Sequence, residues 1–183
     1  MIRAILISVL FFGIFSSAIA QPKIVGFKKL QLFLPGIELP GFERNKPTGR
    51  TQTVMGMTTS EASVEYASKS TGNENDTVPH IQIQIRIQDV TFMPYVLVAF
   101  SMMQQGNESE TESGYEKAVS VKTVYPGKIT AQTGEYKNCK IEFGVANRFL
   151  VQLEASNTSD PLILNKLIDK MDLENLAKVE ADK

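Results

Sequence analysis

The chain has one cysteine, one histidine and no tryptophan among its 183 residues. A single cysteine, Cys139, excludes an internal disulfide, so the core must hold the fold together. One histidine and one cysteine cannot supply the three or four nitrogen and sulfur ligands of a usual zinc site. A serine triad would depend on His80, but no Gly-x-Ser-x-Gly turn accompanies it, and we interpret this histidine as a solvated residue at a strand edge. We therefore predict no catalytic residue and no metal ligand.

The sequence also has no large excess of positive or negative charge and no phosphate-binding motif. The chain has 19 basic and 20 acidic residues, so no basic field favours nucleic acid as a partner. Neither Gly-x-x-x-x-Gly-Lys nor Gly-x-Gly-x-x-Gly occurs, and we predict no cofactor. The stretch 107–114 carries three glutamates but lacks the Asp/Asn spacing and central glycine of a calcium loop. We predict a solvated acidic loop there.

The first twenty residues have the features of a secretory signal. Arg3 lies near the start, the apolar run Ala4–Phe15 follows, and the small-residue site Ala-Ile-Ala occupies 18–20. The run is shorter than the roughly 18 to 20 residues that a membrane-spanning helix needs. We predict cleavage after Ala20, export to the periplasm or the medium, and no stable membrane anchor after cleavage.

The most regular stretch of the chain is Ile81–Gln88, where isoleucine alternates with polar residues. A two-residue period places all the isoleucines on one face of a strand. Burying four isoleucines contributes a gross free energy of about 6 to 12 kcal/mol, which specifies the register. The other face is a row of long polar side chains that we predict to be partly wet. This row is our candidate interaction face: Gln82, Gln84, Arg86 and Gln88.

Three antiparallel hairpins are predicted. The strand at 62–70 pairs with 81–88 across the turn-rich run 71–76, and the piece 50–57 pairs beside it. The strand 115–122 pairs with 128–132 across Pro126-Gly127. The strand 139–145 pairs with 149–153 across the tight turn at Ala146-Asn147.

Two principal helices are predicted. The first begins at Pro94 and ends near Gln105, and its residues are apolar nearly all round, which favours burial. The second begins after Asp160-Pro161 and runs to Met171 with helical spacing of its apolar residues. Asp172 is predicted to cap a last short turn.

These elements predict an α+β fold with a mainly antiparallel sheet of about six strands covered by the two helices. The predicted organisation is a signal at 1–20, a Pro/Gly-rich segment at 21–60 packed on the core edge, a single α+β domain at 61–178 and a charged tail at 179–183.

Several apolar, aromatic and turn positions form one pattern, at 39–42, 60–66, 114–117, 147–151 and 172–173. This pattern resembles a family of bacterial exported proteins whose function is uncharacterised. The closing pattern, a hairpin with Arg-Phe-Leu-Val before a helix, also resembles PsbP proteins of photosystems and LpqN-type envelope lipoproteins. The resemblance implies a fold and an exported location, and it carries over no catalytic residue. The lipid-bearing cysteine of the lipoproteins is missing here.

Two functional hypotheses follow. The first is a non-catalytic envelope module that binds an envelope protein or a small ligand. The second is an envelope hydrolase that uses dispersed carboxylates, although no carboxylate pair stands out from the sequence. Cys139 shares a face with Ile141 and Phe143, so we interpret it as a buried small hydrophobe in preference to a reactive thiol.

Overall fold

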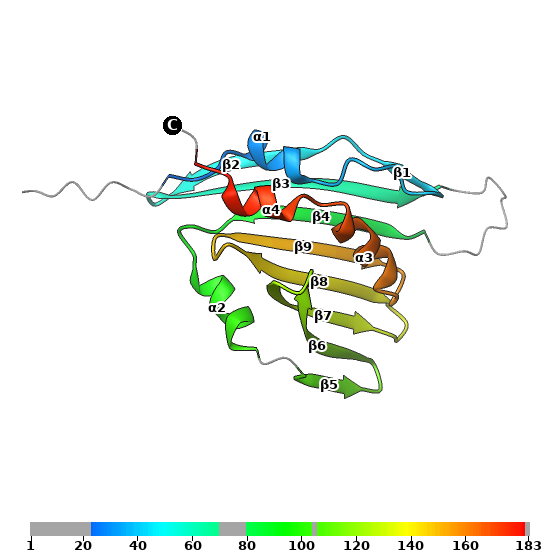
Figure 1. The fold of residues 1–183 in the computed structure, drawn as a ribbon. Coiled ribbons are helices and arrows are strands. Elements are labelled where there is room, and N and C mark those ends of the chain that lie inside the picture. Colours follow the sequence, from blue (N-terminus) through cyan, green and yellow to red (C-terminus); the bar gives the residue numbers. More distant parts are fainter. Residues whose placement is uncertain (1–22, 70–79, 104–105, 182–183) are drawn as a thin grey trace, which may run out of the picture.

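The computed structural model describes residues 23–69, 80–103 and 106–181, and it builds them around one antiparallel sheet (Figure 1). The sheet order is β1-β3-β4-β9-β8-β7-β6-β5, and β2 also pairs with β3. The described residues form nine strands: β1 (Phe42–Arg44), β2 (Thr48–Val54), β3 (Met57–Ser68), β4 (Gln82–Asp89), β5 (Glu108–Thr111), β6 (Gly114–Val121), β7 (Tyr125–Gln132), β8 (Asn138–Val145) and β9 (Phe149–Ser156).

The α+β class and the antiparallel sheet are confirmed, but the expected strand number of about six is too low. The Pro/Gly-rich segment contributes β1 and β2, which both pair with the long strand β3. The acidic stretch at 107–114 is not a loop, because β5 pairs with β6 there as an exposed edge strand. Charged side chains on a short, fully exposed strand hide the period that would reveal it.

Two hairpins appear where they were predicted. β3 pairs with β4, although the turn-rich run 71–76 lies outside the described residues. β8 pairs with β9 across Ala146 and Asn147, both of which have positive φ. The predicted position of the β6–β7 turn is wrong, since that turn consists of residues 122–124. Gly127 lies inside β7, where a Cβ would approach the Glu142 carbonyl oxygen to 2.3 Å, so close strand contact and not a turn requires this glycine.

The helices are shorter than predicted, and they cover both faces of the sheet. The second predicted helix is α3, which ends at Asp169. The short turn predicted after it is α4, and Asp172 caps it as expected by accepting from the backbone N–H of Asn175. No helix within the described ranges is long and apolar enough to cross a bilayer. The helices are α1 (Phe27–Leu30), the 3-10 helix η1 (Gln31–Phe33), α2 (Tyr95–Met102), α3 (Leu162–Asp169) and α4 (Leu173–Lys178).

The main core lies between one sheet face and the helices α1, α3 and α4. Ile83, Ile85 and Ile87 of β4 are buried in it, as their alternation predicts. α2 packs on the opposite face, where Leu97 and Phe100 contact Leu150 in a second, smaller cluster. Both predicted helices do cover the sheet, but from opposite sides.

Asp89, at the end of β4, is fully buried and accepts several hydrogen bonds. Its Oδ2 accepts from the backbone N–H of Val25 at 2.7 Å and from Arg148 Nη2 at 2.9 Å and Nε at 3.1 Å. Its Oδ1 accepts from the backbone N–H of Thr91 at 3.0 Å. One carboxylate therefore joins the start of the described chain, the segment that leads to α2, and the β8–β9 turn.

We predict that Asp89→Ala lowers the free energy of unfolding by about 3 to 5 kcal/mol, because it leaves the Arg148 charge and two backbone donors without their acceptor. Urea denaturation measures this loss. Thr91→Val is the matched control, since it removes only a hydroxyl donor to the same carboxylate and we expect a cost of about 1 kcal/mol. If Asp89→Ala lowered the free energy of unfolding by less than Thr91→Val does, the anchoring role of Asp89 would be contradicted.

Candidate functional site

The sheet face opposite the main core is polar, and α2 covers only one end of it. We call this polar surface the open face. Strand pairing aligns its side chains into two rows that cross the sheet. The first row consists of Glu65, Gln84, Glu154, Lys140, Thr130 and Glu116, and the second of Ser63, Arg86, Gln152, Glu142 and Lys128.

The predicted interaction residues lie on this face. Gln82 is exposed and Gln84, Arg86 and Gln88 are half-buried, while the isoleucines between them face the core. Arg86 Nη2 donates to Gln84 Oε1 at 3.1 Å, so these two long side chains support each other. The structure therefore places these residues as the alternation predicts, and their role in an interaction stays a prediction.

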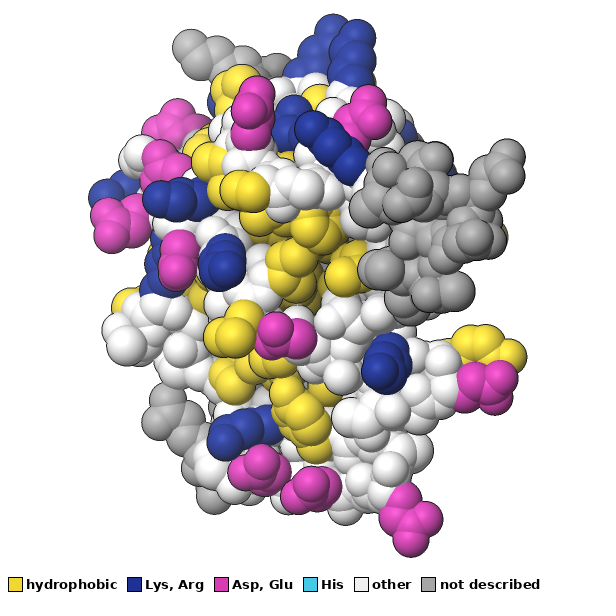
Figure 2. All heavy atoms as spheres, turned by 90° about the vertical axis from the view of Figure 1, so that its right-hand side faces the viewer, with side chains coloured by type: hydrophobic (Ala, Val, Ile, Leu, Met, Phe, Trp, Pro, Cys, Tyr) yellow, Lys and Arg dark blue, Asp and Glu magenta, His cyan; other side chains and the backbone are white. Residues whose placement is uncertain are grey.

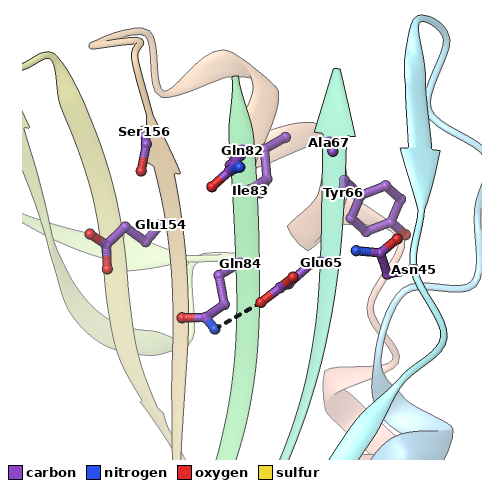
Figure 3. A pocket seen from close by; sticks show the side chains of 9 residues that line it. All are labelled: Asn45, Glu65, Tyr66, Ala67, Gln82, Ile83, Gln84, Glu154 and Ser156. Carbon is purple, nitrogen blue, oxygen red and sulfur yellow. Dashed lines mark hydrogen bonds between the residues drawn. The ribbon is translucent and has the colours of Figure 1, made fainter. Parts of the chain in front are cut away.

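Gln84 lines a hollow of about 270 Å³ in the open face (Figure 3). Glu65 of β3 lies on one side of it and Glu154 of β9 on the other, and Gln84 Nε2 donates to Glu65 Oε1 at 3.5 Å. Gln82, Asn45 and Ser156 complete the polar lining. The lining contains two carboxylates and no cationic side chain, so the hollow favours ligand groups that donate hydrogen bonds or carry positive charge.

A smaller hollow of about 70 Å³ adjoins the first and shares Gln84 and Glu154 with it. Its other lining residues are Arg86, Lys140 and Gln152, so it adds two positive charges to the surface. Within the described part of the chain, Arg86 Nε is buried and has no hydrogen-bond partner. A buried donor of this kind is costly unless a ligand or water satisfies it.

Sequence reasoning missed the carboxylates of the hollow. Glu65 and Glu154 come from strands that are 89 positions apart in the sequence, and only the β3–β4–β9 order brings them to Gln84. Their alternation with apolar residues is a signal that each faces away from the core. Which strands are neighbours could not be read from that pattern.

The Glu142 carboxylate of the open face is bound by both a lysine and a glutamine. Its Oε1 lies 2.8 Å from Lys140 Nζ and accepts from Gln152 Nε2 at 2.6 Å. Burial alone would raise the pKa of Glu142, but these hydrogen bonds and the charges of Lys140 and Lys128 outweigh burial and lower the pKa. The carboxylate is therefore held ionised, which suits a structural role in the rows.

The one histidine and the one cysteine of the sequence lie away from the hollow. His80 is exposed before β4, and its carbonyl accepts from Asn157 Nδ2. Cys139 is fully buried in the main core, as predicted. Burial, with a smaller contribution from the Asp160 charge, raises the pKa of the Cys139 thiol to about 11. A thiol with such a pKa is a weak nucleophile at neutral pH.

No family model matches the chain, and neither the curated proteins nor the solved structures contain a significant match. The resemblance to exported, PsbP-like and LpqN-like proteins therefore stays a prediction.

We predict that Glu142 stabilises the fold only above acidic pH. Because its pKa is lower in the folded state than its ordinary value of 4.5, its contribution is present above that value and is lost as the pH falls through the folded pKa. Glu142→Gln should therefore unfold at a lower temperature than the wild type at pH 7, and the gap should narrow below about pH 4. In a Lys140→Gln background the gap at pH 7 should shrink, and an unchanged gap would contradict the ion-pair explanation.

We predict that Cys139 does not react with a thiol reagent in the native protein at about pH 8. The thiol is buried and its raised pKa leaves little thiolate under these conditions. Absorbance of released thionitrobenzoate from Ellman's reagent measures the reaction. Full reaction is expected in denaturing urea, and rapid reaction without urea would show that the thiol is accessible.

Proposed function

We propose that this protein is an exported binding module and that the open face around Gln84 is its binding surface. The observation that carries the proposal is the hollow itself, which is lined by five polar residues on neighbouring strands, namely Glu65, Gln82, Gln84, Glu154 and Ser156. Export is supported by the signal-like first twenty residues. The ligand or partner protein would be exported too.

Rigidity supports a binding role for this surface. Strands position the side chains, and β4 is hydrogen-bonded on both sides by β3 and β9. A ligand would not have to order a loop before it binds, so less conformational entropy is lost. The hollow of about 270 Å³ is close to the lower end of the usual range for small-molecule sites, about 300 Å³.

The charges of the surface indicate what it would recognise. Glu65 and Glu154 would accept hydrogen bonds from ammonium, amide or hydroxyl groups of a ligand. Arg86 and Lys140 next to them would donate to a hydrogen-bond acceptor or a carboxylate of the ligand. The best-fitting ligand thus has donors at one end and an acceptor at the other. A peptide segment and an amino sugar both have such groups.

We predict that the double variant Gln84→Ala, Arg86→Ala loses capture of the envelope partner and keeps its thermal stability nearly unchanged. Both side chains lie on the wet face, and neither fills the core. Affinity capture from periplasmic extract, with identification of the retained protein, measures the first effect. A thermal melt measures the second.

Gln132→Ala is the matched control, because Gln132 is exposed at the end of β7 away from both hollows. It should bind as the wild type does. If the double variant captured the same partner with equal yield, the open face would not be the binding surface.

A further inference from the structure

Four connections of the sheet lie at the same end, on the left in Figure 1. Register requires this, because Ser60 of β3 pairs with Asp89 of β4, which in turn pairs with Phe149 of β9. We call this the apolar end. It consists of the β2–β3 turn at 54–57, the segment 90–103 with α2, the β6–β7 turn at 122–124 and the β8–β9 turn at 146–148.

Exposed apolar side chains are concentrated at this end. Of the ten large apolar residues exposed in the described part of the chain, seven lie here. Met55 is 94% exposed, Met102 76% and Tyr95 69%. Such a concentration is unusual for a surface that faces only water. The seven are Val54, Met55, Met57, Tyr95, Val98, Met102 and Val124.

The same connections lack acidic residues. The stretches 51–60 and 90–107 contain no charged residue, and 118–127 and 143–153 contain only Lys122 and Arg148. The Asp89 carboxylate at this end is buried and paired with Arg148, and Glu61 pairs with Arg50. Asp172 and Glu174 lie on the side of α4. The opposite end has glutamates or aspartates in its turns, at 112, 135 and 160. Figure 2 looks onto that end, where charged side chains surround a narrow apolar strip.

The β2–β3 turn carries an apolar residue, Met55, at a position whose backbone geometry disfavours it. Met55 and Gly56 form a two-residue turn and have φ values of 51° and 77°. This left-handed geometry favours Asn-Gly, and a side chain such as that of Met is disfavoured there by roughly 1 kcal/mol. Met55 nevertheless points into solvent, so burial does not compensate for this cost. Conformational strain at an exposed position suggests a function.

The chain enters the described fold at this end as well. The carbonyl of Lys23 accepts from Arg148 Nη2, and Val25 is bound to Asp89. The described chain therefore begins beside the β8–β9 turn, within the apolar end.

We propose that the apolar end docks reversibly on the surface of an anionic phospholipid bilayer. The apolar groups stand on separate turns and a helix, as in proteins that insert several short projections between headgroups, and Met and Tyr suit that interface. Lys122 would add attraction to anionic lipid. This contact is independent of the open face, and it does not span the bilayer.

The absence of tryptophan gives a direct test with the mature chain expected after cleavage at Ala20, in which the apolar run Ala4–Phe15 cannot itself insert into the vesicles. Two single-tryptophan variants are made, Tyr95→Trp on α2 and Tyr136→Trp in the β7–β8 turn, where the tyrosine is 81% exposed at the opposite end. Each is mixed with vesicles of phosphatidylglycerol and phosphatidylcholine that carry brominated acyl chains. We expect a blue shift and strong quenching for Trp at 95 and neither change at 136. Equal quenching at both ends, or none at 95, would overturn the proposal.

A second variant separates docking from stability. Met55→Asn suits the turn, so we expect it to keep or raise the melting temperature while it weakens quenching in the Tyr95→Trp background. Unchanged quenching for Met55→Asn together with Met102→Ser would overturn the docking surface. A blue shift that grows with protein concentration in the absence of vesicles would assign the surface to a second copy of the chain, and would also overturn the proposal.

Discussion

The arrangement of this molecule depends on one buried carboxylate. Asp89 accepts hydrogen bonds from Val25, Thr91 and Arg148, and each belongs to a segment that approaches the ends of β4 and β9 from a different direction. Burying a charge is costly, so the fold retains it only with a cation and several donors in place. That requirement fixes the entry of the chain, the path toward α2 and the β8–β9 turn together.

The open face and the apolar end are set roughly at right angles by this arrangement. The open face lies along the strands, whereas the apolar end lies across their ends. If the apolar end rests on a bilayer, the strands point away from the lipid and the hollow around Gln84 faces sideways. Lipid contact and ligand binding would then not compete for the same residues.

Local patterns in the sequence predicted the strands with strong alternation. The isoleucine strand, the hairpin at Ala146-Asn147 and the short helix capped at Asp172 needed only period, turn and cap signals. β5 was missed because all four of its residues are exposed, and the turn predicted at Pro126-Gly127 is wrong because close strand contact also requires glycine. The hollow could not be predicted from the sequence, because it depends on β9 lying beside β4, a pairing that no local signal encodes.

That pairing has a consequence for how the chain folds. Among the described strands, β1 to β4 and β5 to β9 are two groups whose internal pairings join near neighbours in sequence, and the β4–β9 ladder is the single seam between the groups. Residues paired across the seam, such as Gln88 and Leu150, are 62 positions apart. Loop closure makes such contacts slow to form, so each group should gain structure before the seam closes. Asp89, which lies on the seam, would acquire its partner Arg148 only in that last step.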